Sequence, residues 1–103
     1  MRIIWTDSAQ QSQDAAADYI FDEFGAMPLH DFYNNLDEIE NNLIAFPEMG
    51  KVEPLLQDRS KLYRSIVASK YNKIIYFVDE DIIYIVDFWD TRREPKAQAS
   101  RLK

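Results

Sequence analysis

The chain has 103 residues, 47% of them apolar and 14% aromatic, which is enough for one domain whose hydrophobic core needs no cross-links. It has no cysteine and a single histidine, so disulfides, a thiol nucleophile and zinc sites built from cysteine or several histidines are excluded. The net charge of −6 is unevenly distributed: residues 1–58 contain 2 basic and 12 acidic side chains, and residues 59–103 contain 10 basic and 6 acidic ones. This division predicts either a basic surface that meets a partner or an acidic half that merely keeps the protein soluble.

A short strand followed by an amphipathic helix is expected at the start of the chain. Arg2 to Thr6 is rich in strand-forming residues, and this apolar run is too short for a leader peptide or a membrane span. Asp7 is predicted to cap a helix over Ser8 to Phe24, with Gln10 completing a capping box and Gly25 ending the helix. The expected apolar side of this helix consists of Ala9, Ala16, Ala17, Ile20, Phe21 and Phe24.

A second helix is predicted between Pro28, which suits a first turn, and Pro47, which ends it. Its apolar residues recur every three or four positions: Leu29, Phe32, Leu36, Ile39, Leu43 and Phe46. His30 falls in the first turn and is interpreted as an exposed bystander rather than a catalytic residue. Two consecutive helices with a short join are expected to form an antiparallel hairpin that packs on something flat.

Three strands are expected after a connector of turn-forming residues over 46–54. They are Leu62–Ser69, Lys73–Val78 and Ile82–Trp89, joined by segments short enough for antiparallel hairpins. The last of them is almost continuously apolar, which predicts an interior position in the sheet. Residues 96–103 are expected to form a short basic helix or a solvated tail.

The predicted fold class is α+β, with the order β-α-α-β-β-β in a single domain over residues 1–103. A helical hairpin would pack on one face of a mostly antiparallel sheet. The other face, built from the basic half of the chain, would remain open, or partly so, and is the expected place for a partner or a reaction.

The ordered set of motifs resembles the RelE/ParE toxin superfamily over about residues 2–102. The segments that carry the resemblance are Phe46-Pro47, Tyr63-Arg64-Ser65-Ile66-Val67, Tyr71-Asn72-Lys73-Ile74-Ile75-Tyr76-Phe77-Val78 and Phe88-Trp89-Asp90-Thr91-Arg92-Arg93-Glu94-Pro95. No single one of these motifs is highly specific, so it is their order that supports the resemblance.

The resemblance implies a cytoplasmic bacterial toxin of a type II toxin–antitoxin system, of the kind linked to plasmid stabilization, with an antitoxin as partner. ParE-like members bind DNA gyrase, whereas RelE-like members are ribosome-dependent mRNA endoribonucleases that need no metal or other cofactor. A third alternative is a non-toxic binding module of the same fold. No membrane partner is expected, and the assembly would be a homodimer or a toxin–antitoxin hetero-oligomer. The ParE-like alternative is preferred, and whether the chain is an enzyme stays open.

Nuclease chemistry would need cations to hold the charge that develops on the attacked phosphate and a group that takes the proton of the 2′-hydroxyl. By motif position the resemblance assigns the cationic role to Arg64, to Lys73 and to Arg92 or Arg93. Asp90 is a weak candidate for the base, because an exposed carboxylate has a pKa near 4. Ile66 and Ala68 stand where RelE-like nucleases have further basic residues, and no tyrosine or histidine follows Tyr84, so the catalytic set is half present.

Tyr71, Trp89, Arg92 and Arg93 are the predicted binding residues. Each has a structural alternative: cross-strand packing for Tyr71, core packing for Trp89 and a salt-bridged surface turn for the two arginines. For Arg64, the alternative is a structural ion pair with an acidic helix residue, since its neighbours by alternation are apolar.

Overall fold

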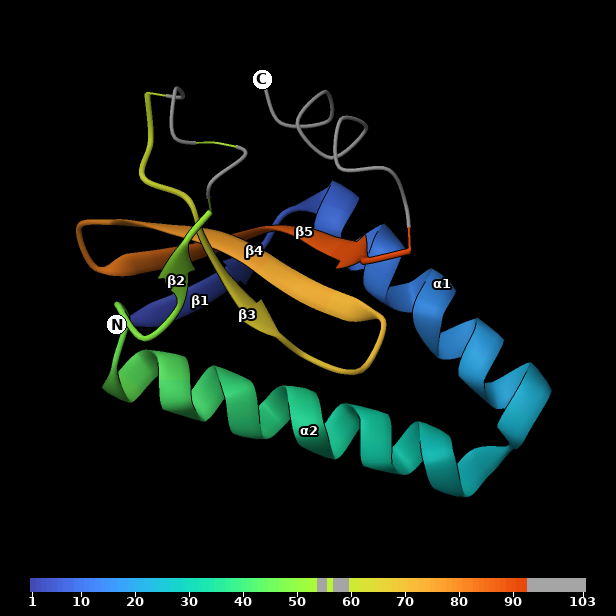
Figure 1. Ribbon diagram of the computed structural model, residues 1–103. Helices are drawn as coiled ribbons and strands as arrows, with labels where there is room; N and C mark the ends of the chain where they lie inside the picture. The colour runs from blue at the N-terminus through green and yellow to red at the C-terminus, as the bar shows by residue number, and fades with distance from the viewer. Residues whose placement is uncertain (54–55, 57–59, 93–103) are drawn as a thin grey trace.

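The computed structural model describes residues 1–53, 56 and 60–92 of the chain. The described elements follow the predicted order, with one additional short strand (Figure 1). They are β1 (Arg2–Trp5), α1 (Asp7–Phe24), α2 (Ala26–Ala45), β2 (Lys51–Val52), β3 (Arg64–Val67), β4 (Asn72–Asp79) and β5 (Ile82–Asp90). The α+β class and the helical hairpin packed on a mostly antiparallel sheet are therefore confirmed.

The strands form one sheet in the order β1-β5-β4-β3-β2. β1 pairs in parallel with β5, and the other neighbours are antiparallel. β5 has a partner on both sides, which confirms the interior position that its apolar sequence predicted. The two residues of β2 lie in the segment that was expected to be a connector. The strand was not predicted, because two residues are too few to show a strand pattern.

The junctions of α1 differ from expectation at its start and agree at its end. The cap is Thr6 rather than Asp7: the Thr6 Oγ1 accepts a hydrogen bond from the Ala9 N–H at 3.2 Å. The Thr6 N–H also donates to the Ile85 carbonyl at 2.9 Å, so β5 fixes the residue from which the helix begins. Gly25 ends α1 with a φ of 91°, a backbone conformation that favours glycine, and α2 follows directly.

Both helices cover the same face of the sheet and supply its main hydrophobic core. Side chains of this core come from α1, α2, β3, β4 and β5. Its buried members are Ala9, Leu36, Ile39, Leu43, Ala68, Ile74, Tyr76, Ile83, Ile85 and Phe88. At the edge of this core the Trp5 indole Nε1 donates to Glu40 Oε1 at 2.8 Å, linking β1 to α2.

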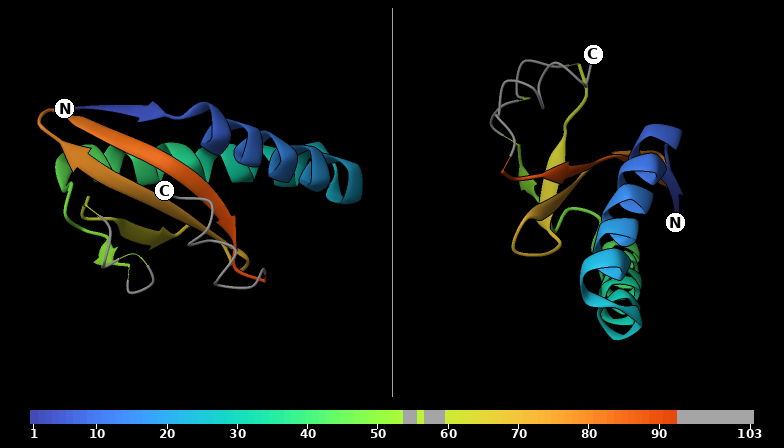
Figure 2. Two further views of the ribbon diagram at one scale, coloured as in Figure 1. Left: turned by 90° about the horizontal axis from the view of Figure 1, so that it is seen from above. Right: turned by 90° about the vertical axis from the view of Figure 1, so that its right-hand side faces the viewer.

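The helical hairpin extends beyond the sheet at the α1–α2 junction, as the views of Figures 1 and 2 agree. Phe21 and Phe24, expected on the buried side of α1, are therefore 52% and 62% exposed, because no strand lies beneath this part of the helix. Within the described part of the chain, neither helix is long and apolar enough to span a membrane.

The second face of the sheet is open only in part. Leu56 and Tyr63 lie over Ile75 and Trp89 and form a smaller buried cluster there. A β-bulge in β5 shapes this face: Ile75 pairs with Asp87 and Tyr76 with Ile85, so Val86 is the additional residue. As a result, both Val86 and Asp87 point to the second face.

Candidate functional site

Arg64 lies on the helix-covered face of the sheet, away from the other predicted site residues. It pairs across β3–β4 with Tyr76, a member of the main core. Its Nη1 donates to the Gly50 carbonyl at 2.8 Å and to the Glu48 carbonyl at 3.4 Å. The expectation that Arg64 shares a face with Lys73 is wrong, because Lys73 pairs with Val67, three residues further along β3 and hence on the opposite side.

Lys73 lies on the second face and forms an ion pair that the sequence did not predict. Its Nζ is 2.9 Å from Glu53 Oε2, with side-chain exposures of 19% for Lys73 and 3% for Glu53. The Glu53 N–H donates to the Tyr63 carbonyl at 2.9 Å, which fixes the carboxylate beside β3. Glu53 follows β2 directly, and a lone glutamate before Pro54 in a connector gave no signal that it would be buried.

Two further residues of β5 complete the surroundings of this pair. Trp89 is the cross-strand partner of Lys73 and is only 2% exposed. Asp87, which the bulge turns to the same face, is 1% exposed. The second face therefore brings one partly exposed cation together with two buried carboxylates and a buried indole, whose ring is packed in the smaller cluster.

Arg92 and Tyr71, both predicted as binding residues, lie in contact at the end of β5. The Arg92 guanidinium lies 4.6 Å from the centre of the Tyr71 ring, and Lys70 Nζ lies 5.2 Å from it on the surface. Arg92 also donates from Nε and Nη2 to the two oxygens of Asp90, at 3.0 and 2.8 Å. These hydrogen bonds raise the pKa of Arg92, so it stays charged. Arg93 lies outside the described residues.

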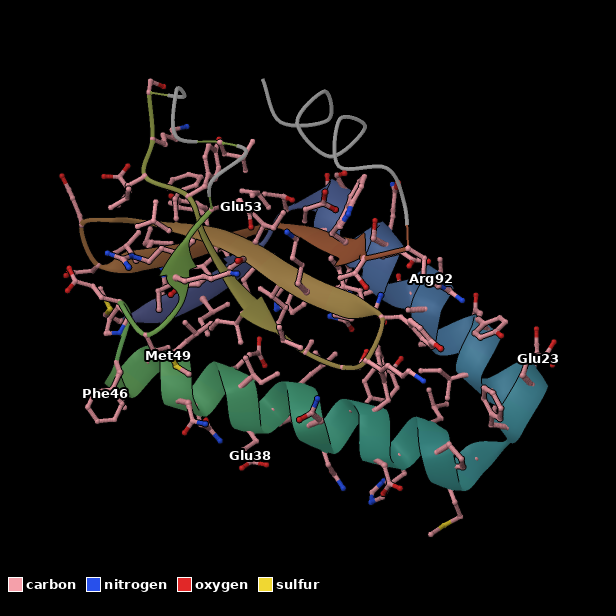
Figure 3. All side chains as sticks on the ribbon, viewed as in Figure 1. Glu23, Glu38, Phe46, Met49, Glu53 and Arg92 are labelled. Carbon is pink, nitrogen blue, oxygen red and sulfur yellow. The ribbon has the colours of Figure 1, made fainter. Side chains whose placement is uncertain are left out.

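The Lys73–Glu53 pair and the Arg92–Tyr71 contact occupy neighbouring positions at one end of the sheet. Lys73 pairs with Trp89, the next pair is Asn72 with Asp90, and the Thr91 N–H then donates to the Tyr71 carbonyl at 2.7 Å. Figure 3 shows Arg92 at the end of β5, and Glu53 in the chain that follows β2. This arrangement offers cations and an aromatic ring to an anionic or aromatic partner. Within residues 1–53, 56 and 60–92, no three metal-ligating side chains lie close enough to hold a metal ion.

Comparisons with known proteins give the same fold and identify a family. Residues 3–95 match the family described as "ParE toxin of type II toxin-antitoxin system, parDE". No curated protein matches the chain significantly.

Several solved structures resemble this fold, among them the following two. One is described as the chromosomal ParDE toxin–antitoxin system from P. aeruginosa, with a TM-score of 0.68 and 18% identity over 87% of this chain and 95% of that one. The other is described as the YoeB dimer from Staphylococcus aureus, with a TM-score of 0.59 and 16% identity over 86% of this chain and 94% of that one. At these identities the structures establish the fold, and the family match covers most of the sequence. The chain therefore belongs to the ParE toxin family of type II toxin–antitoxin systems.

Proposed function

We propose that this toxin arrests growth by binding DNA gyrase and that a cognate antitoxin neutralises it. The observation that carries the proposal is the match to the ParE family over residues 3–95. In this proposal the gyrase contact is made by the exposed end of β5 and the second face beside it, where Arg92, Tyr71 and Lys73 lie.

The geometry favours a protein-binding toxin over a nuclease. Phosphodiester cleavage needs cations that are available to the developing charge on the phosphate. Among the candidates, Lys73 is engaged by Glu53, Arg92 by Asp90, and Arg64 lies on the other face of the sheet. These cations do not converge on one reacting centre, whereas a protein surface is bound by separate contacts.

One observation favours the ribosome-dependent nuclease as the second candidate. The Glu53 carboxylate is buried beside a cation on the face of the sheet opposite the helices, and a carboxylate in such surroundings is a typical general base. If the chain cleaves mRNA, Glu53 and not Asp90 is the base that the arrangement favours, with Lys73 holding the charge on the phosphate.

The two candidates are separated by measuring gyrase supercoiling and mRNA cleavage on translating ribosomes with the same purified protein. Gyrase inhibition is expected, and it should fall about tenfold or more for Arg92→Ala and Tyr71→Ala, since residues at an interface centre contribute most of the binding energy. Arg2→Ala, an exposed cation on β1, is the matched control and should inhibit normally. If the parent protein leaves gyrase supercoiling unchanged and cleaves mRNA on ribosomes, and the Glu53→Gln variant does not cleave, the nuclease replaces the gyrase-binding toxin as the proposed function.

A further inference from the structure

A groove with an apolar lining lies at the end of α2, far from Lys73 and Arg92. Its volume is about 640 Å³. It is lined by Met1, Ala45, Phe46, Pro47, Met49 and Val78, with Glu48 as the one charged side chain. Phe46 and Met49, which Figure 3 shows at this end of the helix, are 69% and 48% exposed. Large apolar side chains gathered at one exposed place are typical of an interaction site.

The loop that carries this groove is held in place by hydrogen bonds with Tyr76 and Arg64. The Tyr76 hydroxyl donates to the Pro47 carbonyl at 2.8 Å and accepts from the Gly50 N–H at 2.9 Å. Arg64 adds its donations to the carbonyls of Gly50 and Glu48 from the same side. The groove is therefore formed before any partner arrives, and a partner need not supply the free energy to order it.

The charged side chains at the groove are predominantly acidic. Glu48 lines it, and Glu80 and Asp81, which form the β4–β5 turn just beyond the end of β4, are exposed. The nearest cations on the strands point to the other face. Lys51 pairs with Ser65, which pairs with Ile75 of the second-face cluster. Arg2 precedes Ile3, a residue packed against the main core, so by alternation Arg2 also points away.

The helices next to the groove add to this acidity. Asp7–Ala45 contains nine aspartates and glutamates and no lysine or arginine. Figure 3 shows Glu38 of α2 pointing away from the sheet. A partner that crosses from the groove onto these helices therefore meets negative charge throughout, and lysine and arginine would be favoured in it.

We infer that the groove around Phe46 and Met49 binds a basic amphipathic segment of the antitoxin, which inserts a large apolar side chain and places lysines or arginines against Glu48 and the turn residues Glu80 and Asp81. This inference rests on the proposed function for the identity of the partner. It assigns the neutralising contact a chemistry: an acidic toxin surface that selects a cationic segment.

The groove is tested directly with two fluorescent synthetic peptides that share one apolar face with a central phenylalanine. One has lysine and the other glutamate at every polar position, and binding is followed by anisotropy. The lysine peptide is expected to bind at least about tenfold more tightly at low salt, and the difference should shrink as salt rises. Equal affinities of the two peptides would overturn the charge selection.

Substitutions then locate the site. Phe46→Ser should weaken the lysine peptide about tenfold or more, and Glu48→Lys should remove most of the preference for lysine. Met27→Ser, in the first turn of α2 and with a side chain 72% exposed, is the matched control and should bind normally. Equal weakening by Met27→Ser and Phe46→Ser would show that the groove is not the site. Because Phe46 is 69% exposed, its variant is expected to unfold at the same denaturant midpoint as the parent, which is checked in parallel.

Growth assays test the occupant and separate the two proposals. The parent toxin and its Phe46→Ser variant are each expressed alone and together with the protein encoded by the reading frame next to the toxin gene. Both are expected to arrest growth alone, and only the parent should be rescued. Equal rescue of the two would remove the antitoxin as occupant. Absence of growth arrest by the parent protein would contradict the proposed function, while the peptide measurements would still decide whether the groove binds basic segments.

Discussion

The two faces of the sheet differ in what they bury. Among residues 1–53, 56 and 60–92, the face beneath α1 and α2 carries a core of ten buried residues, none of them charged. Among the same residues, the opposite face has a cluster of four buried residues, and beside it lie Glu53, Asp87 and Lys73. The free energy of folding is therefore supplied mainly by the helix-covered face, while the second face uses part of its area for charged groups whose burial is costly.

The test with the largest expected effect compares Leu43 on the helix-covered face with Leu56 on the second face. The two side chains are equally buried, at 0% and 1% exposure. Leu43→Ala is expected to lower the free energy of unfolding by about 4 kcal/mol and Leu56→Ala by only about 2 kcal/mol. The reason is that Leu43 is surrounded by the larger cluster between α2 and the sheet, whereas Leu56 belongs to the smaller cluster of the second face. Urea unfolding measures both values, and equal losses would contradict the ranking of the two faces.

The next test crowds the helix-covered face at Gly50. A Cβ built on Gly50 would lie 2.7 Å from the Tyr76 Oη and 2.9 Å from the Ser65 carbonyl oxygen. Gly50→Ala is therefore expected to cost about 2–3 kcal/mol, since the phenol and the loop must move apart. Gly25→Ala is not a matched control, because its φ of 91° introduces strain of its own. Lys51→Ala, at the exposed neighbouring position, should unfold like the parent.

On the second face, the ion pair between Lys73 and Glu53 is tested by a double-mutant cycle. Lys73→Met and Glu53→Gln are measured singly and together, and a coupling free energy of about 1–2 kcal/mol is expected. The 19% exposure of Lys73 allows water to screen the pair, which places the value below that of fully buried pairs. A coupling near zero would mean that the two charges are held by other contacts rather than by each other.

The sequence was sufficient for those parts of the fold that depend on long periodic patterns. The helices over residues 7–45 and the apolar strand β5 were predicted because their side-chain periods extend over many residues. Phe21 and Phe24 were assigned to a buried side because periodicity shows which side of a helix is apolar, but not where the sheet beneath it ends. β2 has no pattern to read at a length of two residues.

The candidate site depended on features that no local pattern contains. Arg64 was placed with Lys73 because both are cations on adjacent strands, yet the β3–β4 register sends them to opposite faces. Reading β5 as an uninterrupted alternation would put Asp87 on the same face as Ile83 and Ile85, and only the bulge at Val86 reverses this. The ion pair of Glu53 with Lys73 could not be predicted from local sequence, because it forms only when the fold brings these two distant residues together. Tyr71 and Arg92 were each predicted as binding residues from two different motifs, but no local pattern indicated that their side chains would be in contact.

The smallest expected effect is the pH dependence of stability that the helix-covered face produces through Tyr76. Tyr76 is fully buried there, and burial raises the pKa of its phenol above the ordinary value of 10. Because the folded protein holds this proton more tightly than the unfolded chain, the resulting stability is complete below about pH 10 and is lost as the pH rises toward the folded-state pKa. Tyr76→Phe removes two hydrogen bonds and should cost about 1 kcal/mol at neutral pH. Urea unfolding of parent and variant between neutral and strongly alkaline pH should show the gap between them closing above pH 10. A gap that stays constant over this range would mean that the Tyr76 phenol ionises as readily in the folded protein as in the unfolded chain, and that the covered face is more accessible to water than its packing indicates.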